Sequence, residues 1–134
     1  MTRYSTSVEI ACTPAAPAEA RELITHTLAG ANAADLFPQA QLVVSELVTN
    51  AVLHTDCERV RVDVELHSEG RLRLAVVDTD PDHLPVPRSS ARAEIGGHGL
   101  HIVEGMAAEW GADADGDAKV VWAELRSVQD STTN

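Results

Sequence analysis

An unbroken alternation of apolar and polar residues constrains the fold of this chain more than any other feature of its sequence. In the segment RVRVDVELH, residues 59–67, three valines and a leucine alternate with charged side chains and a histidine. A period of two predicts a strand with one buried face. After the turn sequence SEGR, the segment LRLAVVD, residues 72–78, predicts a second strand that pairs with the first as an antiparallel hairpin. The apolar face of this hairpin needs a covering layer.

Two segments with helical periodicity can supply that layer. Thr13 is a candidate cap for a first helix that ends near Ala29. A second helix is predicted from Pro38 to about His54 or Thr55. Its apolar residues fall within roughly 100° of one another around the helix axis. This predicted core stripe consists of Val44, Leu47, Val48 and Ala51.

The remaining segments complete an α+β fold. Residues 3–12 predict an edge strand, a third helix begins in a glycine-rich turn before Leu100, and two strands end near Arg126. We therefore expect a two-layer α/β sandwich with a mixed, mostly antiparallel sheet and helices on one face. One domain is expected to cover residues 1–134, with its core at about 7–126, a lid at 80–98 and a disordered tail at 127–134.

Composition and charge exclude several classes of protein. A net charge of −11 with only ten Lys and Arg argues against direct nucleic-acid binding, which needs a clustered basic surface. No apolar run reaches the roughly 18 residues that cross a bilayer. The first residues also lack a secretory signal, so we expect a cytoplasmic protein without membrane contact. Aromatic residues make up 3% of the chain, and Trp110 and Trp122 are expected to pack in an otherwise aliphatic core.

A polar row runs along the predicted second helix. Glu46, Asn50 and His54 recur every four residues in VVSELVTNAVLHT and therefore form one ridge beside the apolar stripe. A carboxylate and a carboxamide one turn apart offer a base and a neutral oxygen donor, which suit a hydrated magnesium ion and an activated hydroxyl. A solvated helix edge is the alternative explanation.

Two later segments add chemistry of the same kind. Asp78 closes a buried strand, where a carboxylate can accept a hydrogen bond from an exocyclic amine such as that of adenine. Gly96, Gly97 and Gly99 precede a helical pattern, and exposed amides at a helix start can receive phosphates. A turn-initiating aspartate and an ordinary loop end are the structural alternatives.

Together these segments resemble the GHKL superfamily of ATP-binding domains, whose fold is the Bergerat-type sandwich. SELVTNAVLHT is similar to its N box, VVDTD to the start of its first glycine box, and GGHGLHIVEGMAAEWG to its second glycine box. The resemblance extends from about Ser7 to Arg126. Within the superfamily, the sequence most resembles free-standing bacterial kinases that are anti-sigma factors and phosphorylate serine or threonine.

The resemblance implies a role for each polar residue at the centre of the site. Asn50 is expected to ligate Mg²⁺ bound to the ATP phosphates, Glu46 to act as the general base, and Asp78 to hold the adenine amine.

It also implies roles for the residues around them. Gly97 and Gly99 are expected to let backbone amides wrap the phosphates, with Leu100 buried behind them. His98 is expected in the lid near phosphate, and His54 near the sugar or phosphates.

Two departures from the family pattern keep two functions open. Asp80 and Asp82 stand where the first glycine box has glycines, and a threonine near the final strand is missing, with Val120 nearest to its place. The first hypothesis is an ATP- and Mg²⁺-dependent serine kinase that phosphorylates an anti-sigma-factor antagonist in a partner-switching circuit. The second is a non-catalytic or weakly nucleotide-binding module that sequesters a sigma factor or its antagonist. The resemblance also implies a homodimer.

Overall fold

The computed structural model describes residues 2–29, 34–54, 58–68, 70–78, 103–115 and 118–126. In chain order the elements are β1 Thr2–Ala11, α1 Ala16–Leu28, the 3₁₀ turn η1 Ala34–Leu36, α2 Phe37–His54, β2 Arg59–His67, β3 Arg71–Asp78, β4 Glu109–Asp115 and β5 Ala118–Arg126. Residues 103–106 are also helical. The predicted lid and tail lie outside the described residues. No helix in the described part is long and apolar enough to cross a membrane.

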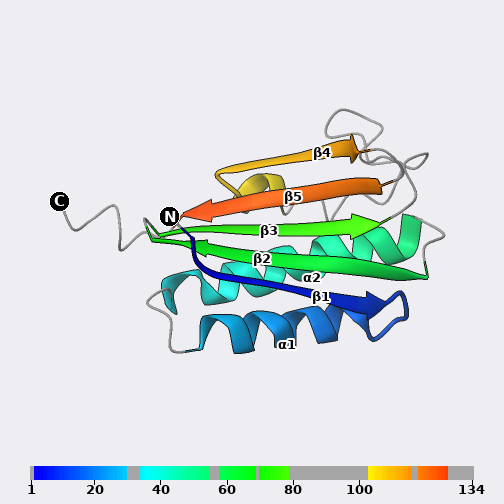
Figure 1. Ribbon diagram of the computed structural model, residues 1–134, viewed down its shortest axis with the longest axis horizontal. Coiled ribbons are helices and arrows are strands. Elements are labelled where there is room, and N and C mark those ends of the chain that lie inside the picture. The colour runs from blue at the N-terminus through cyan, green and yellow to red at the C-terminus, as the bar shows by residue number, and fades with distance from the viewer. Residues whose placement is uncertain are drawn as a thin grey trace.

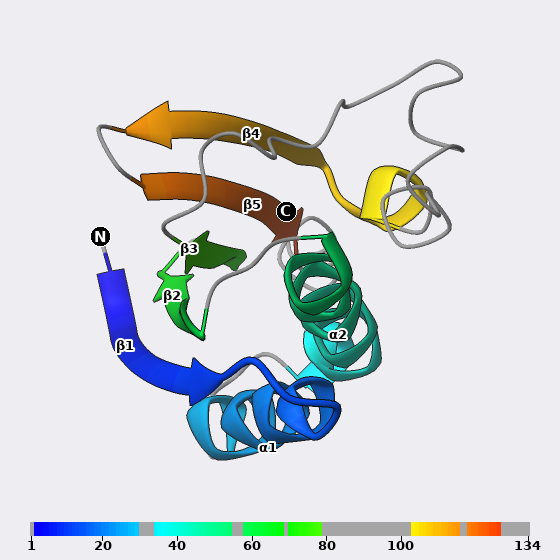
Figure 2. The ribbon, with the colours of Figure 1, turned by 90° about the vertical axis from the view of Figure 1, so that its right-hand side faces the viewer.

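The five strands form one sheet with helices on one of its faces (Figures 1 and 2). Its order is β1-β2-β3-β5-β4, and each of the four pairings is antiparallel. The expected α+β sandwich is therefore confirmed. The predicted edge strand is β1, and the predicted hairpin is β2 and β3.

The strand register explains which face of the sheet the described helices cover. Val62 pairs with Val76, and Val76 pairs with Val121, so one aliphatic row crosses three strands. These three side chains are buried, as the alternation in β2 predicted. The row lies under α2, which packs against β3 and β5. Burial of these aliphatic side chains contributes roughly 25 cal/mol for each Å² removed from water.

The helices lie close to their predicted positions. The α2 helix begins at Phe37, one residue before the predicted start, because η1 leads directly into it. The α1 helix begins at Ala16 with Ala15 as its N-cap, and no side chain caps it. Thr13 therefore does not cap the helix; its Oγ1 accepts the N–H of Ala15 at 3.2 Å and closes the turn before it. All four residues of the predicted α2 core stripe are buried.

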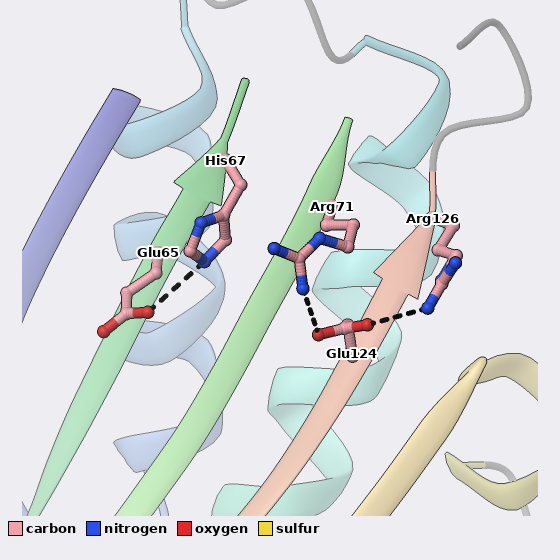
Figure 3. A network of polar contacts seen from close by, with 5 residues as sticks. All are labelled: Glu65, His67, Arg71, Glu124 and Arg126. Atoms are coloured by element: carbon pink, nitrogen blue, oxygen red, sulfur yellow. Dashed lines mark hydrogen bonds and ion pairs between the residues drawn. The ribbon is translucent and has the colours of Figure 1, made fainter. Parts of the chain in front are cut away.

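The second sheet face is polar and carries ion pairs (Figure 3). Arg71 and Arg126 contact the two carboxylate oxygens of Glu124 at 3.2 and 3.3 Å, and His67 Nε2 lies 3.5 Å from Glu65 Oε1. Such pairs stabilise the fold by at most about 1 kcal/mol each where solvent screens them. They pair the charged groups of this face, which none of the described helices covers.

The two tryptophans lie on opposite sides of the sheet. Trp110 packs against the core, as predicted. Trp122 lies on the polar face, because strand alternation places its neighbours Val121 and Ala123 in the core. The guanidinium carbon of Arg73 lies 4.6 Å from the Trp122 ring centroid, a cation–π distance. The prediction of a core position for Trp122 was therefore wrong.

Gly111 is the strand position on which Trp122 depends. A Cβ added at Gly111 would lie 2.9 Å from the Trp122 ring, whereas one added at Gly105 would meet nothing within 4 Å. We expect Gly111→Ala to lower the free energy of unfolding by about 1–3 kcal/mol through overpacking. Gly105→Ala is the matched control and should be neutral or stabilising, because alanine favours helix. Thermal unfolding followed by circular dichroism measures both; an unchanged midpoint for Gly111→Ala would contradict the contact.

Candidate functional site

One flank of α2 is occupied by α1. Arg21 Nη1 donates to Ser45 Oγ at 2.8 Å. Gln41 Nε2 donates to the Arg21 carbonyl at 3.3 Å and to Thr25 Oγ1 at 3.0 Å. These contacts fix the rotation of α2 about its own axis and identify the flank that faces α1.

The polar row lies on another flank. At about 100° per residue, Glu46 is roughly 100° around the helix from Ser45, and Asn50 roughly 140° from it. Both side chains are half-buried. These angles turn the row away from the flank that contacts α1. Figure 2 shows α2 between α1 and the helical residues 103–106. His54 is the last residue of α2, and its side chain lies outside the described part.

Asp78 lies at the same end of the fold. It is the last residue of β3 and is 2% exposed. Asp78 is separated from Leu74 and Val76 by an even number of residues along β3, so its side chain is on the same, helix-covered face. In Figure 1 the end of β3, the start of β5 and the C-terminal half of α2 lie together at one end of the molecule. Asp78 therefore lies at the end of the sheet that is shared with the C-terminal half of α2.

Lys119 is the residue that sequence reasoning missed. It pairs with Asp78 in the β3–β5 register, and its Nζ lies 3.6 Å from Asp78 Oδ2. Val120, the residue nearest to the place of the missing threonine, pairs with Val77 and lines a hollow on the polar face. The sequence did contain a signal for it: in the strand AKVVWAELR, Lys119 lies two and four residues before the core residues Val121 and Ala123, and therefore on the same face of the sheet.

Burial makes this ion pair consequential. The Lys119 and Asp78 side chains are 3% and 1% exposed, respectively. An unpaired charge at such a place costs several kcal/mol, and an opposite charge nearby offsets part of that. A separation of 3.6 Å exceeds the roughly 2.7–2.9 Å of a charge-assisted hydrogen bond. Through this contact the ammonium offsets the negative charge of the carboxylate.

The remaining predicted site residues lie outside the described part of the chain. They are Gly97, His98, Gly99 and Leu100, together with the substituted positions Asp80 and Asp82. Of the predicted third helix, Val103–Met106 is described and helical, and Val103 is fully buried in the core.

A double-mutant cycle tests the pairing of Asp78 with Lys119. Asp78→Ala and Lys119→Met should each lower the free energy of unfolding by about 3–5 kcal/mol, because each leaves a buried charge without its partner. The double variant should lose less than the sum, with a coupling of about 1–3 kcal/mol. Urea unfolding measures all four proteins. Strict additivity would mean that the two charges do not stabilise one another.

Comparison with known proteins shows which family model the sequence matches. Residues 10–125 match the histidine kinase-like ATPase domain. No curated protein sequence matches the chain significantly.

Two solved structures share the fold. The first contains the RsbU and RsbW domains of Rv1364c from Mycobacterium tuberculosis, with a TM-score of 0.70, 18% identity, and coverage of 92% of this chain and 32% of that one. The second is the histidine kinase domain of the Erythrobacter litoralis EL346 blue-light activated histidine kinase, with a TM-score of 0.52, 21% identity, and coverage of 92% and 64%. The chain therefore spans less than two thirds of each of these structures.

Proposed function

The chain belongs to the histidine kinase-like ATPase domain family, and from this premise we propose that it is an ATP- and Mg²⁺-dependent serine protein kinase acting on an anti-sigma-factor antagonist. The observation that supports the proposal is that α2, which carries Glu46 and Asn50, packs against β3, which ends at Asp78. Glu46 and Asn50 lie on one flank of α2, and Asp78 ends the neighbouring strand β3. We treat residues 1–134 as a single domain, with residues 80–98 as its lid.

The described donors fit a magnesium nucleotide. Mg²⁺ prefers oxygen ligands and retains several waters, so the Asn50 carboxamide oxygen suffices as a protein ligand beside phosphate oxygens. The buried Asp78 carboxylate is an acceptor for the adenine amine. Bound Mg²⁺ would neutralise charge that develops on the phosphates.

Glu46 is the proposed general base. It would take the proton of a substrate serine hydroxyl as that oxygen attacks the γ-phosphate in line, while ADP leaves. Its half-buried place one turn before Asn50 sets base and metal ligand side by side on the helix. Positioning and electrostatic stabilisation account for most of the catalysis in phosphoryl transfer.

The other predicted residues complete the proposal. Amides around Gly97 and Gly99 would hold the phosphates, with Leu100 packed behind them, and His98 and His54 would line the phosphate and sugar region.

The proposed partners are a sigma factor and its antagonist, with a second copy of the chain as dimer mate. Fold similarity to a structure with RsbU and RsbW domains supports partner switching. The polar sheet face supports a protein contact, because it presents arginines and carboxylates together and none of the described helices covers it. Function within the cytoplasm follows from such partners.

Replacement of the proposed base separates chemistry from binding. Glu46→Gln should lower the rate of phosphate transfer about 10²–10⁴-fold while magnesium–ATP still binds, because the amide cannot accept the proton. Transfer of labelled phosphate to candidate antagonists measures the rate, and calorimetry measures binding. Glu22→Gln, an exposed carboxylate on α1, is the matched control. Equal transfer by Glu46→Gln and the wild-type protein would rule out Glu46 as the base.

Replacement of the proposed metal ligand tests nucleotide binding. Asn50→Ala should weaken magnesium–ATP binding at least tenfold, because a ligand to the phosphate-bound ion is lost. Gln41→Ala removes an amide from the opposite, α1-facing flank and should leave affinity unchanged. If wild-type protein binds magnesium–ATP only at millimolar concentration or not at all, the non-catalytic binding module becomes the better account.

A further inference from the structure

Lys119 is a buried cation to which the proposed kinase chemistry assigns no role. It faces Asp78 across the β3–β5 pairing, with 3.6 Å between Nζ and Oδ2. Both side chains are nearly excluded from water. Lysine is almost never fully buried unless it is paired, so its position at the end of a core-facing strand row is specific. Any group that hydrogen-bonds to the Asp78 carboxylate comes close to the Lys119 ammonium.

Adenine carries a donor and an acceptor side by side on one edge. The 6-amino group is a donor, and the adjacent ring nitrogen N1 is an acceptor. A carboxylate alone satisfies the donor and leaves N1 without a partner in a dry pocket. Hydrogen-bonding sites discriminate strongly when a buried polar group would otherwise stay unpaired. A cation beside Asp78 supplies the missing donor.

We propose, on the basis of the proposed nucleotide site, that Lys119 is a second base-recognition residue that donates to adenine N1 while Asp78 accepts from the 6-amino group. An ammonium has three N–H donors, so it can serve the carboxylate and the ring nitrogen together. The register pairing and the distance of 3.6 Å to Oδ2 place the ammonium beside the carboxylate, within reach of the same base edge.

The same pair opposes guanine in this orientation. Guanine has an acceptor, O6, where adenine has its amine, and a protonated N1 where adenine has an acceptor. O6 would meet the Asp78 carboxylate, and N1–H would meet the Lys119 ammonium. Both contacts reverse in sign, so the pair selects adenine by two interactions rather than one.

Nucleotide analogues test the inference on the unmodified protein. Calorimetric titrations with excess Mg²⁺ compare ATP with 1-deaza-ATP, which keeps the amine and lacks N1. We expect 1-deaza-ATP to bind about tenfold or more weakly, as for loss of a hydrogen bond to a charged donor. The matched control is 7-deaza-ATP, which lacks a ring nitrogen on the far side of the base and should bind like ATP. GTP should bind more weakly than ATP.

A variant assigns the effect to the residue. Lys119→Met should bind ATP and 1-deaza-ATP with equal affinity, because the donor to N1 is gone. Circular dichroism establishes that the variant folds; if it does not, the wild-type comparison of the analogues still decides.

The outcomes separate the two proposals. Equal binding of ATP and 1-deaza-ATP by the wild-type protein, tighter binding of GTP than of ATP, or tighter binding of ATP by Lys119→Met would overturn the role of Lys119 and leave the kinase proposal standing. Absence of binding by every nucleotide would overturn both.

Discussion

Burial of a single aliphatic sheet face beneath α2 is the constraint on which the rest of the structure depends. The core contains valines, leucines, isoleucines and alanines from β1, β2, β3 and β5 and from both α1 and α2, with few aromatic residues to add area. Because the apolar stripe of α2 must face the sheet, and Arg21, Ser45 and Gln41 join α2 to α1, the rotation of α2 is fixed. The direction of Glu46 and Asn50 follows from that rotation. The packing of the apolar stripe therefore determines the direction in which the polar row points.

Local periodicity was enough to predict most of the fold. The alternation in β2 and the helical spacing in α2 are properties of consecutive residues, so the hairpin, the stripe and the polar row could be read from the sequence. The alternation in AKVVWAELR also puts Lys119 on the core face and Trp122 on the other, but it does not name the partner of Lys119. The position of Lys119 depends on pairing with Asp78, far away along the chain, and no local pattern specifies that register. For Trp122, strand alternation with its core neighbours Val121 and Ala123 outweighed the preference of a large aromatic ring for burial.

Charged side chains are paired in different environments on the two faces of the sheet. On the polar face, exposed arginines meet carboxylates in pairs that solvent screens, as with Arg61 and Asp63 at 2.9 Å. That contact raises the pKa of the Arg61 guanidinium through a hydrogen bond and the nearby negative charge. On the helix-covered face, Asp78 and Lys119 interact with little water between or around them. The same kind of pair is worth little on one face and constrains the site on the other.

The charge balance around Asp78 bears on how the chain can hold a polyanion. Because Lys119 is matched by Asp78, its charge is not available to attract phosphates. The nearest described ridge adds a carboxylate, Glu46, to a chain with a net charge of −11. Repulsion of a nucleotide triphosphate must then be offset by a divalent cation and by backbone amides, neither of which requires a basic side chain. A lysine at this position suits the uncharged end of the nucleotide, which is the base. There the Lys119 donor and the Asp78 acceptor together select which base binds.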